Sequence, residues 1–287
     1  MTKGSDACKG LKPIESMTRK SAILNEEVKT KLSKRAMRKE KRRMQWDDRK
    51  MEKKRKRQEQ QRVKKANGLM PLVQELDMSE NAVLRRKERA IAKRESYLMA
   101  AEEGIKVVID CEFEEKMTEK EKKSLSQQIM FSYGVNRRSK TPMNTYITSL
   151  HGDIQQNLEN ISGFHEWQAF TGSSKSYMDL FKKESLVYLT ADSPTTITRL
   201  SRDKVYIIGG IVDRNRLKGI TYQKAVEQGI ETVKLPLDAV VEMGSATRVL
   251  TVNHVFQLLA QFSEVKDWAQ ATLATLPSRK GAHLKEQ

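Results

Sequence analysis

The chain has 287 residues, enough for one sizeable domain with extensions or for two small domains. It carries 54 Lys and Arg against 37 Asp and Glu, and this net charge of +17 suits a polyanion, either nucleic acid or an anionic membrane. No apolar run approaches the ~20 residues that span a bilayer, and residues 1–20 lack the apolar core of a secretory signal. We therefore expect neither a membrane span nor a secretory leader.

The cysteines and histidines form no pattern typical of a disulfide framework or a metal site. Cys8 and Cys111 are far apart in the sequence, which argues against a disulfide scaffold and fits a reducing compartment. The four histidines show no spacing typical of metal ligands. We therefore expect no metal in this protein.

The N-terminal part is strongly basic. Residues 1–25 are polar and mixed in charge, so we expect a disordered tail. Residues 26–65 hold 19 Lys and Arg and 7 Asp and Glu without proline or glycine, which predicts a long charged helix. Its surplus of 12 positive charges (19 − 7) favours a phosphate-binding arm. A solvated helix and a nuclear import signal stay open as alternatives.

A second helix is predicted at 79–103, after a break at 68–71, and it ends near Gly104. We place the main domain boundary at this glycine. Residues 26–104 then form a basic helical extension, residues 105–280 form the main domain, and residues 281–287 form a tail.

Strands and helices alternate through the main domain. Apolar, β-rich runs predict strands at 106–110, 144–147, 186–192, 205–208 and 232–235. A capping box at Thr118 and Glu121 begins a helix that we expect to stop at Gly134. Further helices are predicted at 162–170, 195–200, 221–228 with Thr221 as a possible N-cap, 251–262 and 267–276. This alternation indicates an α/β domain with a mostly parallel sheet.

The most informative stretch is V-Y-I-I-G-G-I-V-D-R-N-R at 205–216. It predicts a buried strand, a glycine pair that lets a ligand approach the backbone, and then Asp213. In open α/β sheets, ligands bind beyond the carboxyl ends of the strands, where Asp213 falls beside Arg214 and Arg216, cations suited to phosphate. A strand, a turn and a solvated carboxylate remain the alternative interpretation.

Seven stretches together resemble one family. They are VIDCEF at 108–113, SLSQQ at 124–128, YGVNRR at 133–138, VYLTAD at 187–192, the run at 206–216, KLPL at 234–237 and RVLTVNH at 248–254. Their order and spacing resemble the SPOUT-class transfer-RNA N1-methyltransferases that act on the purine at the ninth nucleotide, in the vertebrate-type nucleocytoplasmic branch. The resemblance covers residues 106–280, and the basic extension resembles that family's tRNA-binding arm.

The resemblance implies a fold, a cofactor and a set of site residues. The fold would be an α/β sheet whose C-terminal segment threads a loop to form a trefoil knot. S-adenosylmethionine, without a metal, would be held by Leu189, Gly209, Thr221, Leu235, Arg248, Val249 and Leu250. Asp213 would be the general base or an orienting carboxylate, and tRNA would contact Gln128, Asn136, Arg137, Arg214 and Arg216. The protein would be a monomer without an obligate protein partner, in the nucleus, the cytoplasm or both.

The chemistry at the base leaves two substrates open. Guanine N1 carries a proton that must leave during attack, and a nearby carboxylate can accept or polarise it. Adenine N1 carries none, so an adenine-directed enzyme would need no base. The target base lies inside folded tRNA and is expected to be turned out of the stack. Methylation of guanine is our leading hypothesis; the alternatives are methylation of adenine and a non-catalytic RNA-binding subunit, while the basic helix lacks the apolar face of a membrane-surface protein.

Overall fold

The computed structural model describes residues 33–66, 77–214, 216–242, 249–276 and 283–284. The chain divides into two compact units, Met1–Asp77 and Met78–Gln287. The tail predicted at 1–25 lies outside the described residues.

The first unit contributes the long helix α2 (Lys34–Ala66). It confirms the helix predicted at 26–65 over the part that is described. Nearly all of its described side chains are exposed, and its only aromatic residue, Trp46, has Lys50 Nζ 5.0 Å from the ring centroid. The helix therefore presents a mainly cationic surface to solvent.

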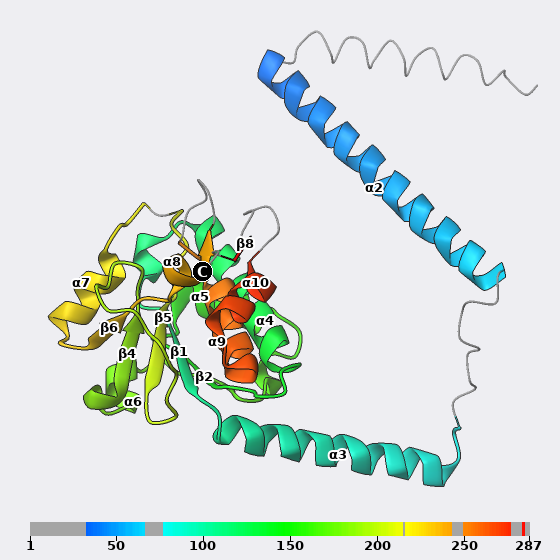
Figure 1. Cartoon of the computed structure of the whole chain (residues 1–287). Helices are drawn as coiled ribbons and strands as arrows, with labels where there is room; N and C mark the ends of the chain where they lie inside the picture. Colours follow the sequence, from blue (N-terminus) through cyan, green and yellow to red (C-terminus); the bar gives the residue numbers. More distant parts are fainter. Residues whose placement is uncertain (1–32, 67–76, 215, 243–248, 277–282, 285–287) are drawn as a thin grey trace, which may run out of the picture. The chain divides into compact units, whose positions relative to one another are not determined.

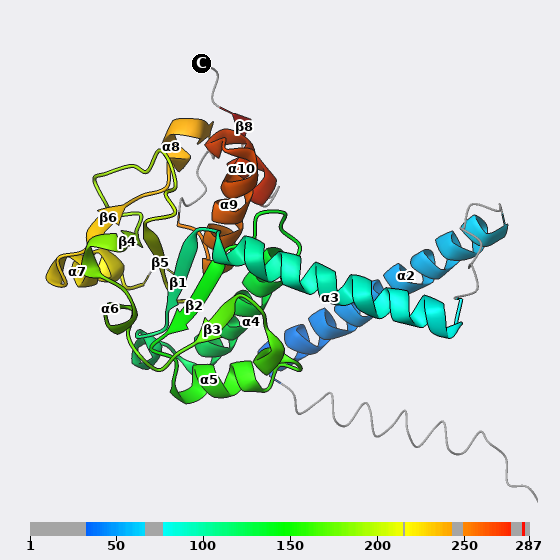
Figure 2. The same cartoon turned by 90° about the horizontal axis from the view of Figure 1, so that it is seen from below.

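The second unit begins with α3 (Glu80–Glu102), which confirms the second predicted helix. Ser79 caps it, because the Ser79 hydroxyl oxygen accepts a hydrogen bond from Ala82 N at 3.3 Å. Near the other end, the Tyr97 hydroxyl accepts from Asn136 Nδ2 at 3.2 Å. Figure 2 shows α3 leading into the first strand of the sheet. Because α3 belongs to this unit, the division between units lies N-terminal to the boundary that we predicted at Gly104.

A six-stranded parallel sheet forms the centre of the second unit and confirms the predicted α/β class. Its strands are β1 (Lys106–Asp110), β2 (Asn144–Thr148), β3 (Phe170–Gly172), β4 (Leu186–Leu189), β5 (Val205–Gly209) and β6 (Glu231–Val233). Their order in the sheet is β3-β2-β1-β5-β4-β6, and every neighbouring pair is parallel. The apolar runs of the sequence become strands because both faces of such a sheet are covered.

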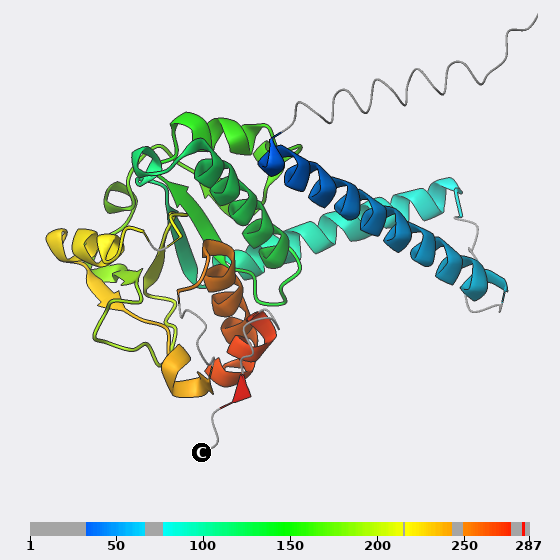
Figure 3. The same cartoon turned by 90° about the horizontal axis from the view of Figure 1, so that it is seen from above.

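Helices cover both faces of this sheet (Figure 1). The larger core lies under α4 (Glu119–Asn136), α5 (Gly152–Glu159), α9 (Val252–Val265) and α10 (Trp268–Thr275). Figure 3 shows α4 between α5 and α9. The smaller core, on the other face, lies under α6 (Tyr177–Leu180) and α7 (Ile220–Glu227).

Short elements connect these layers. They are the 3₁₀ turns η1 (Glu114–Lys116), η2 (Phe164–Glu166) and η3 (Lys183–Ser185), the helix α8 (Leu237–Val240), and the antiparallel pair β7 (Val241–Glu242) and β8 (His283–Leu284).

The connections that leave β1 and β5 run to opposite faces of the sheet. These two strands are neighbours, but β1 leads to α4 on the face of the larger core, and β5 leads to α7 on the opposite face. Connections that leave adjacent strands toward opposite faces open a crevice at the carboxyl ends of those strands, where ligands bind in such sheets. The fold therefore places a candidate site where Asp110 ends β1 and Gly209 ends β5, two residues that are paired in register.

Helix α4 continues past Gly134 to Asn136, so our prediction that it stops at the glycine is wrong. A Cβ at Gly134 would meet only the Arg138 guanidinium, at 3.5 Å, so nothing there forces the helix to end. Asn136 instead fixes the end of the helix, because its amide donates to Met143 O and accepts from Met143 N, each at 2.8 Å. Tertiary hydrogen bonds override the tendency of glycine to terminate a helix.

Two predicted short helices are absent from the structure. In the segment 162–170, left-handed residues at Gly163 (φ 77) and Ala169 (φ 57) leave only the turn η2, followed by the unpredicted strand β3. The segment 195–200 is extended instead: Lys234 N donates to Thr195 O at 2.8 Å, and Ile197 N donates to Lys234 O at 2.9 Å. Pairing beside β6 thus satisfies the backbone groups that a helix would have paired. The aromatic side chains at 164 and 167 pack against the larger core.

We expect Asn136→Ala to lower the free energy of unfolding by about 2 kcal/mol, because it leaves both backbone groups of Met143 without their buried partner. Urea denaturation measures this change. Arg137→Ala is the matched control, since Arg137 is the next residue and its side chain is exposed. Equal unfolding midpoints for the two variants would contradict the structural role of Asn136.

Candidate active site

The glycine pair at the end of β5 is required by close packing. A Cβ on Gly209 would lie 2.6 Å from Thr221 Cγ2 and 3.4 Å from the Tyr188 hydroxyl oxygen. A Cβ on Gly210 would lie 2.6 Å from the carbonyl oxygen of Asp110, which accepts a hydrogen bond from Gly210 N at 2.8 Å. Both positions exclude a side chain, so the backbones of β1 and β5 stay close where the strands end.

Asp213 lies on the loop between β5 and α7 and is half-buried. Its Oδ2 atom accepts a hydrogen bond from Leu217 N at 2.6 Å, so the loop holds the carboxylate with its own backbone. Arg214, the next residue, has φ 54, in the left-handed region that few residues other than glycine adopt. Such backbone strain is concentrated at functional sites, and here it lies beside the candidate base.

The first turns after β1 anchor this loop. Arg216 Nη2 donates to Lys116 O at 3.0 Å and lies 3.7 Å from Glu121 Oε2. Val212 N donates to the thioether sulfur of Met117 at 3.2 Å. The guanidinium of Arg216 therefore ties the loop to the start of α4, and its predicted contact with RNA stays a prediction.

Three of the predicted cofactor residues come together at the strand ends. Leu189 ends β4, Gly209 ends β5, and Thr221 lies in the first turn of α7. Thr221 Oγ1 donates to Thr190 Oγ1 at 3.1 Å, which joins α7 to the end of β4. The N-cap of α7 is Gly219 (φ 74), not Thr221 as we had considered.

The other predicted cofactor residues follow later in the chain. Leu235 and Leu250 are half-buried and pack against the larger core, as does Ile211 on the loop after β5. Val249 is 42% exposed. Arg248 lies outside the described residues. These apolar side chains give the carboxyl edge of the sheet a partly exposed hydrophobic surface.

Sequence reasoning missed a buried charge cluster beneath the glycine pair. Asp110 is fully buried, and Lys224 Nζ from α7 lies 2.5 Å from its Oδ2 atom. Burial raises the pKa of the Asp110 carboxyl, while the Lys224 ammonium and the Tyr188 hydroxyl oppose that rise. Sequence reasoning missed Lys224 because a lysine in a short amphipathic helix is usually solvated. The one signal of the cluster in the sequence was Asp110, a carboxylate at the end of an apolar strand.

The predicted RNA-binding residues divide into two groups. Gln128 is buried, and its Oε1 atom accepts from Val252 N at 3.1 Å, which holds the start of α9 against α4. Asn136 is fully buried and bonded to Met143 and Tyr97. Both amides thus serve the fold. The three arginines are exposed (Arg137, Arg214 and Arg216). Contact of all five residues with RNA stays a prediction.

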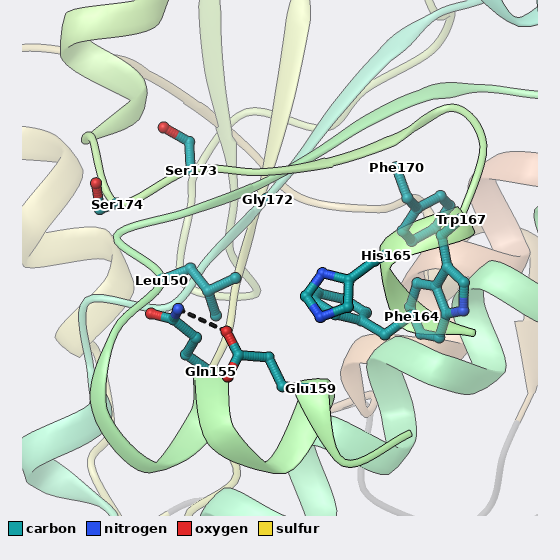
Figure 4. Close-up of a pocket in the computed structure, with 10 residues that line it drawn as sticks. All are labelled: Leu150, Gln155, Glu159, Phe164, His165, Trp167, Phe170, Gly172, Ser173 and Ser174. Atoms are coloured by element: carbon teal, nitrogen blue, oxygen red, sulfur yellow. Dashed lines mark hydrogen bonds between the residues drawn. The ribbon is translucent and has the colours of Figure 1, made fainter. Parts of the chain in front are cut away.

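A separate cavity of about 400 Å³ lies beside the edge strand β3 (Figure 4). Gln155 and Glu159 from α5 line one side, joined by a hydrogen bond of 2.8 Å, and His165 lies across from them. No Lys or Arg lines this cavity, and Glu159 would repel a phosphate. None of its lining residues is among the predicted site residues.

Within the described parts of the chain, no group of three or more His, Cys, Asp or Glu side chains is placed to hold a metal ion. No helix in those parts is long and apolar enough to cross a membrane.

Comparison with known proteins identifies the family. Residues 30–281 match the family described as tRNA (guanine(9)-N(1))-methyltransferase TRM10/TRM10A. This chain belongs to that family. The resemblance drawn from the seven ordered motifs is thereby confirmed.

Two named relatives show how far the similarity extends. The Schizosaccharomyces pombe tRNA (guanine(9)-N1)-methyltransferase is 35% identical over 258 residues, which cover 88% of this chain and 81% of that protein. The Mus musculus tRNA methyltransferase 10 homolog A is 43% identical over 183 residues, which cover 63% of this chain and 56% of that protein. The chain thus spans about half the length of its mouse, Xenopus tropicalis and rat relatives.

A solved structure supports the fold. The crystal structure of a full-length spTrm10–SAH complex is 40% identical, with a TM-score of 0.57 over 60% of this chain and 95% of that chain. The mostly parallel SPOUT-type α/β fold is therefore confirmed. The trefoil knot stays a prediction, because residues 243–248 lie outside the described part of the chain.

We expect Gly209→Ala to lower the free energy of unfolding by about 2 kcal/mol, since its Cβ overpacks the strand end. Adding Thr221→Ser should recover most of that loss, because it removes the Cγ2 atom that the new Cβ meets. Gly134→Ala, inside α4, is the control and should stabilise the protein by up to about 1 kcal/mol. Urea denaturation compares the three proteins, and a double variant no more stable than Gly209→Ala would show that the close approach to Thr221 is not the cause.

Proposed function

We propose that this chain transfers a methyl group from S-adenosylmethionine to N1 of guanine at the ninth nucleotide of tRNA. The observation that carries the proposal is the junction of β1 with β5, where the glycine pair ends β5 and leads into the loop of Asp213, in a chain of the TRM10/TRM10A family. Relatives named as tRNA (guanine(9)-N1)-methyltransferases and a relative crystallised with SAH support the same activity.

The residues at the strand ends fit this cofactor. Leu235 and Leu250 are half-buried and offer apolar surface for an adenine ring, and Leu189 is buried in the larger core at the end of β4. The N–H of Val212 donates to a thioether sulfur, which is a weak acceptor, so it can form a stronger bond to a ligand oxygen. When bound, the cofactor supplies an electrophilic methyl group on a sulfonium sulfur. The protein's part is to position the groups around it.

We assign to Asp213 the role of acting on the proton of the guanine base. Guanine N1 carries a proton, and the half-buried Asp213 carboxylate would accept it or polarise it through a hydrogen bond. The bond from Leu217 N fixes the orientation of this carboxylate on the loop. The Arg216 guanidinium contacts the Glu121 carboxylate and the carbonyl oxygen of Lys116, and these contacts help the loop to keep its shape.

The basic extension is the proposed tRNA-binding arm. Helix α2 alone contains 17 Lys and Arg and 5 Asp and Glu, a surplus of 12 (17 − 5). Such a helix neutralises phosphates and gives salt-dependent affinity. We further propose a monomer without an obligate protein partner, working in the nucleus, the cytoplasm or both; this part rests on the family resemblance alone.

The activity is tested by incubating the protein with tRNA transcripts and cofactor and mapping the product by primer extension. We expect a stop at the ninth nucleotide when it is guanine. Product only on adenine at that position would favour the alternative substrate. RNA binding without any product, and without calorimetric heat from S-adenosylhomocysteine, would favour a non-catalytic RNA-binding subunit.

The same assay tests Asp213. Asp213→Asn should lower turnover on the guanine tRNA about 100-fold, as expected when a general base is lost, with S-adenosylhomocysteine affinity within about twofold of wild type. Asp203→Asn is the matched control, because Asp203 is an exposed carboxylate just before the start of β5, away from the site. Unchanged turnover of Asp213→Asn would remove this residue from the mechanism.

Removing residues 1–77 should weaken tRNA binding at least about tenfold and flatten its dependence on salt, because fewer phosphates are neutralised. The cut falls at the division between the compact units. A second variant keeps the full length and replaces the five cations at 53–57 with glutamine, which preserves helix propensity and removes positive charge. Salt slopes equal to that of the wild type in both variants would refute the arm.

A further inference from the structure

A cluster of buried charge lies where β1 and β5 end side by side. The carboxylate of Asp110 is fully buried and accepts three hydrogen bonds: from Lys224 Nζ at 2.5 Å, from the Tyr188 hydroxyl at 2.8 Å, and from Glu112 N at 3.2 Å. A buried carboxylate is tolerated only when it is paired and hydrogen-bonded in this way.

Lys224 is the centre of the cluster. Its side chain is 12% exposed, and its Nζ atom also lies 2.6 Å from Glu112 Oε2. The same atom lies 4.9 Å from the ring centroid of Phe113 and 5.0 Å from that of Tyr177. Two carboxylates and two aromatic rings thus surround one ammonium group and fix it in place.

This cluster is continuous with the predicted cofactor residues. Lys224 follows Thr221 by three residues on α7, so the two side chains lie on the same face of the helix. Thr221 bonds to Thr190 at the end of β4, and its methyl group fills the space against Gly209. Gly209 is in turn the register partner of Asp110. One set of contacts therefore runs from the end of β1 to the first turn of α7.

Helix α7 needs such an anchor. It has eight residues, and its N-cap, Gly219, supplies no side-chain hydrogen bond. A helix this short is marginal without tertiary contacts. A buried ion pair is also no better for stability than apolar residues of the same size, so its value here lies in the exact placement that it gives.

We propose that Lys224 is a positioning residue for the cofactor site: by pairing with Asp110 it holds the first turn of α7, and with it Thr221, against Gly209 and Thr190. The inference rests on the proposed function and assigns that site a residue outside the predicted cofactor set. Lys224 touches neither the cofactor nor the base in this assignment, and it acts through the placement of Thr221.

The test measures S-adenosylhomocysteine binding by calorimetry in full-length variants. Lys224→Met keeps the length and apolar stem of the side chain and removes its charge. It should weaken binding at least about tenfold and raise KM for the methyl donor, with kcat at saturating donor and tRNA affinity within about twofold of wild type. Unchanged affinity in a folded Lys224→Met protein would overturn the inference.

Lys204→Met is the matched control. Lys204 also bonds a carboxylate and a backbone carbonyl, at 2.8 Å from Glu231 Oε2 and 3.0 Å from Glu184 O, but it precedes β5 at the opposite edge of the sheet. The same chemical change there should leave S-adenosylhomocysteine affinity unaltered. An equal loss in both variants would overturn the assignment of a specific role to Lys224.

A double variant separates positioning from stability. Asp110→Asn combined with Lys224→Met removes both buried charges, so the urea midpoint should return toward that of wild type while binding stays weak. If the double variant recovers both stability and S-adenosylhomocysteine binding, the inference is overturned, because neutralising the buried charge of Asp110 would then be all that Lys224 does.

Lys224→Arg keeps the ion pair with Asp110 and should bind S-adenosylhomocysteine within about threefold of wild type. If the wild-type chain binds no S-adenosylhomocysteine, the result contradicts the proposed function and therefore also the inference.

Discussion

The parallel pairing of β1 with β5 is the constraint on which the rest of the structure depends. It brings Asp110 beside Gly209 although the two residues are far apart in the sequence. The backbones come so close at this point that a Cβ on Gly210 would lie 2.6 Å from the carbonyl oxygen of Asp110. The chain leaves the two strands toward opposite faces of the sheet, and the loop that carries Asp213 begins at this junction.

Local patterns predicted most of the elements and little of their arrangement. The apolar run at 205–208 and the capping box at Thr118 give strand β5 and helix α4, since both depend on neighbouring residues. The segment 195–200 was predicted wrongly because its backbone is satisfied by Lys234, a partner that no local pattern reveals. The prediction of where α4 ends was wrong for the same reason, since the backbone of Met143 holds the Asn136 side chain at that end. Strand order joins segments that are distant in the sequence, and no pattern in the sequence predicted it.

The candidate site shows the same limit. The glycine pair and Asp213 can be picked out in the sequence because they directly follow an apolar run that predicts a buried strand, where glycine often marks a close approach of backbone or ligand. Lys224 does not stand out, because a lysine on a short helix is usually solvated. Only the fold shows that its ammonium lies between Asp110 and Glu112. Residues that position a site through other residues carry weaker local signals than the residues that line it.

The positive charge of the chain is used in two different ways. In the α/β unit, two cations near the site pair with carboxylates: Lys224 with Asp110 and Glu112, and Arg216 with Glu121. In α2 the surplus of cations is exposed, and ion pairs such as that of Lys56 with Glu52 contribute little.

The two uses suit two different ligands. In the α/β unit, the pairing of Lys224 with Asp110 and Glu112 fixes α7 beside the proposed cofactor site. The exposed cations of α2 favour the polyanion. The paired charges of the α/β unit therefore shape the proposed cofactor site, whereas the exposed cations of α2 face solvent, where phosphates can reach them.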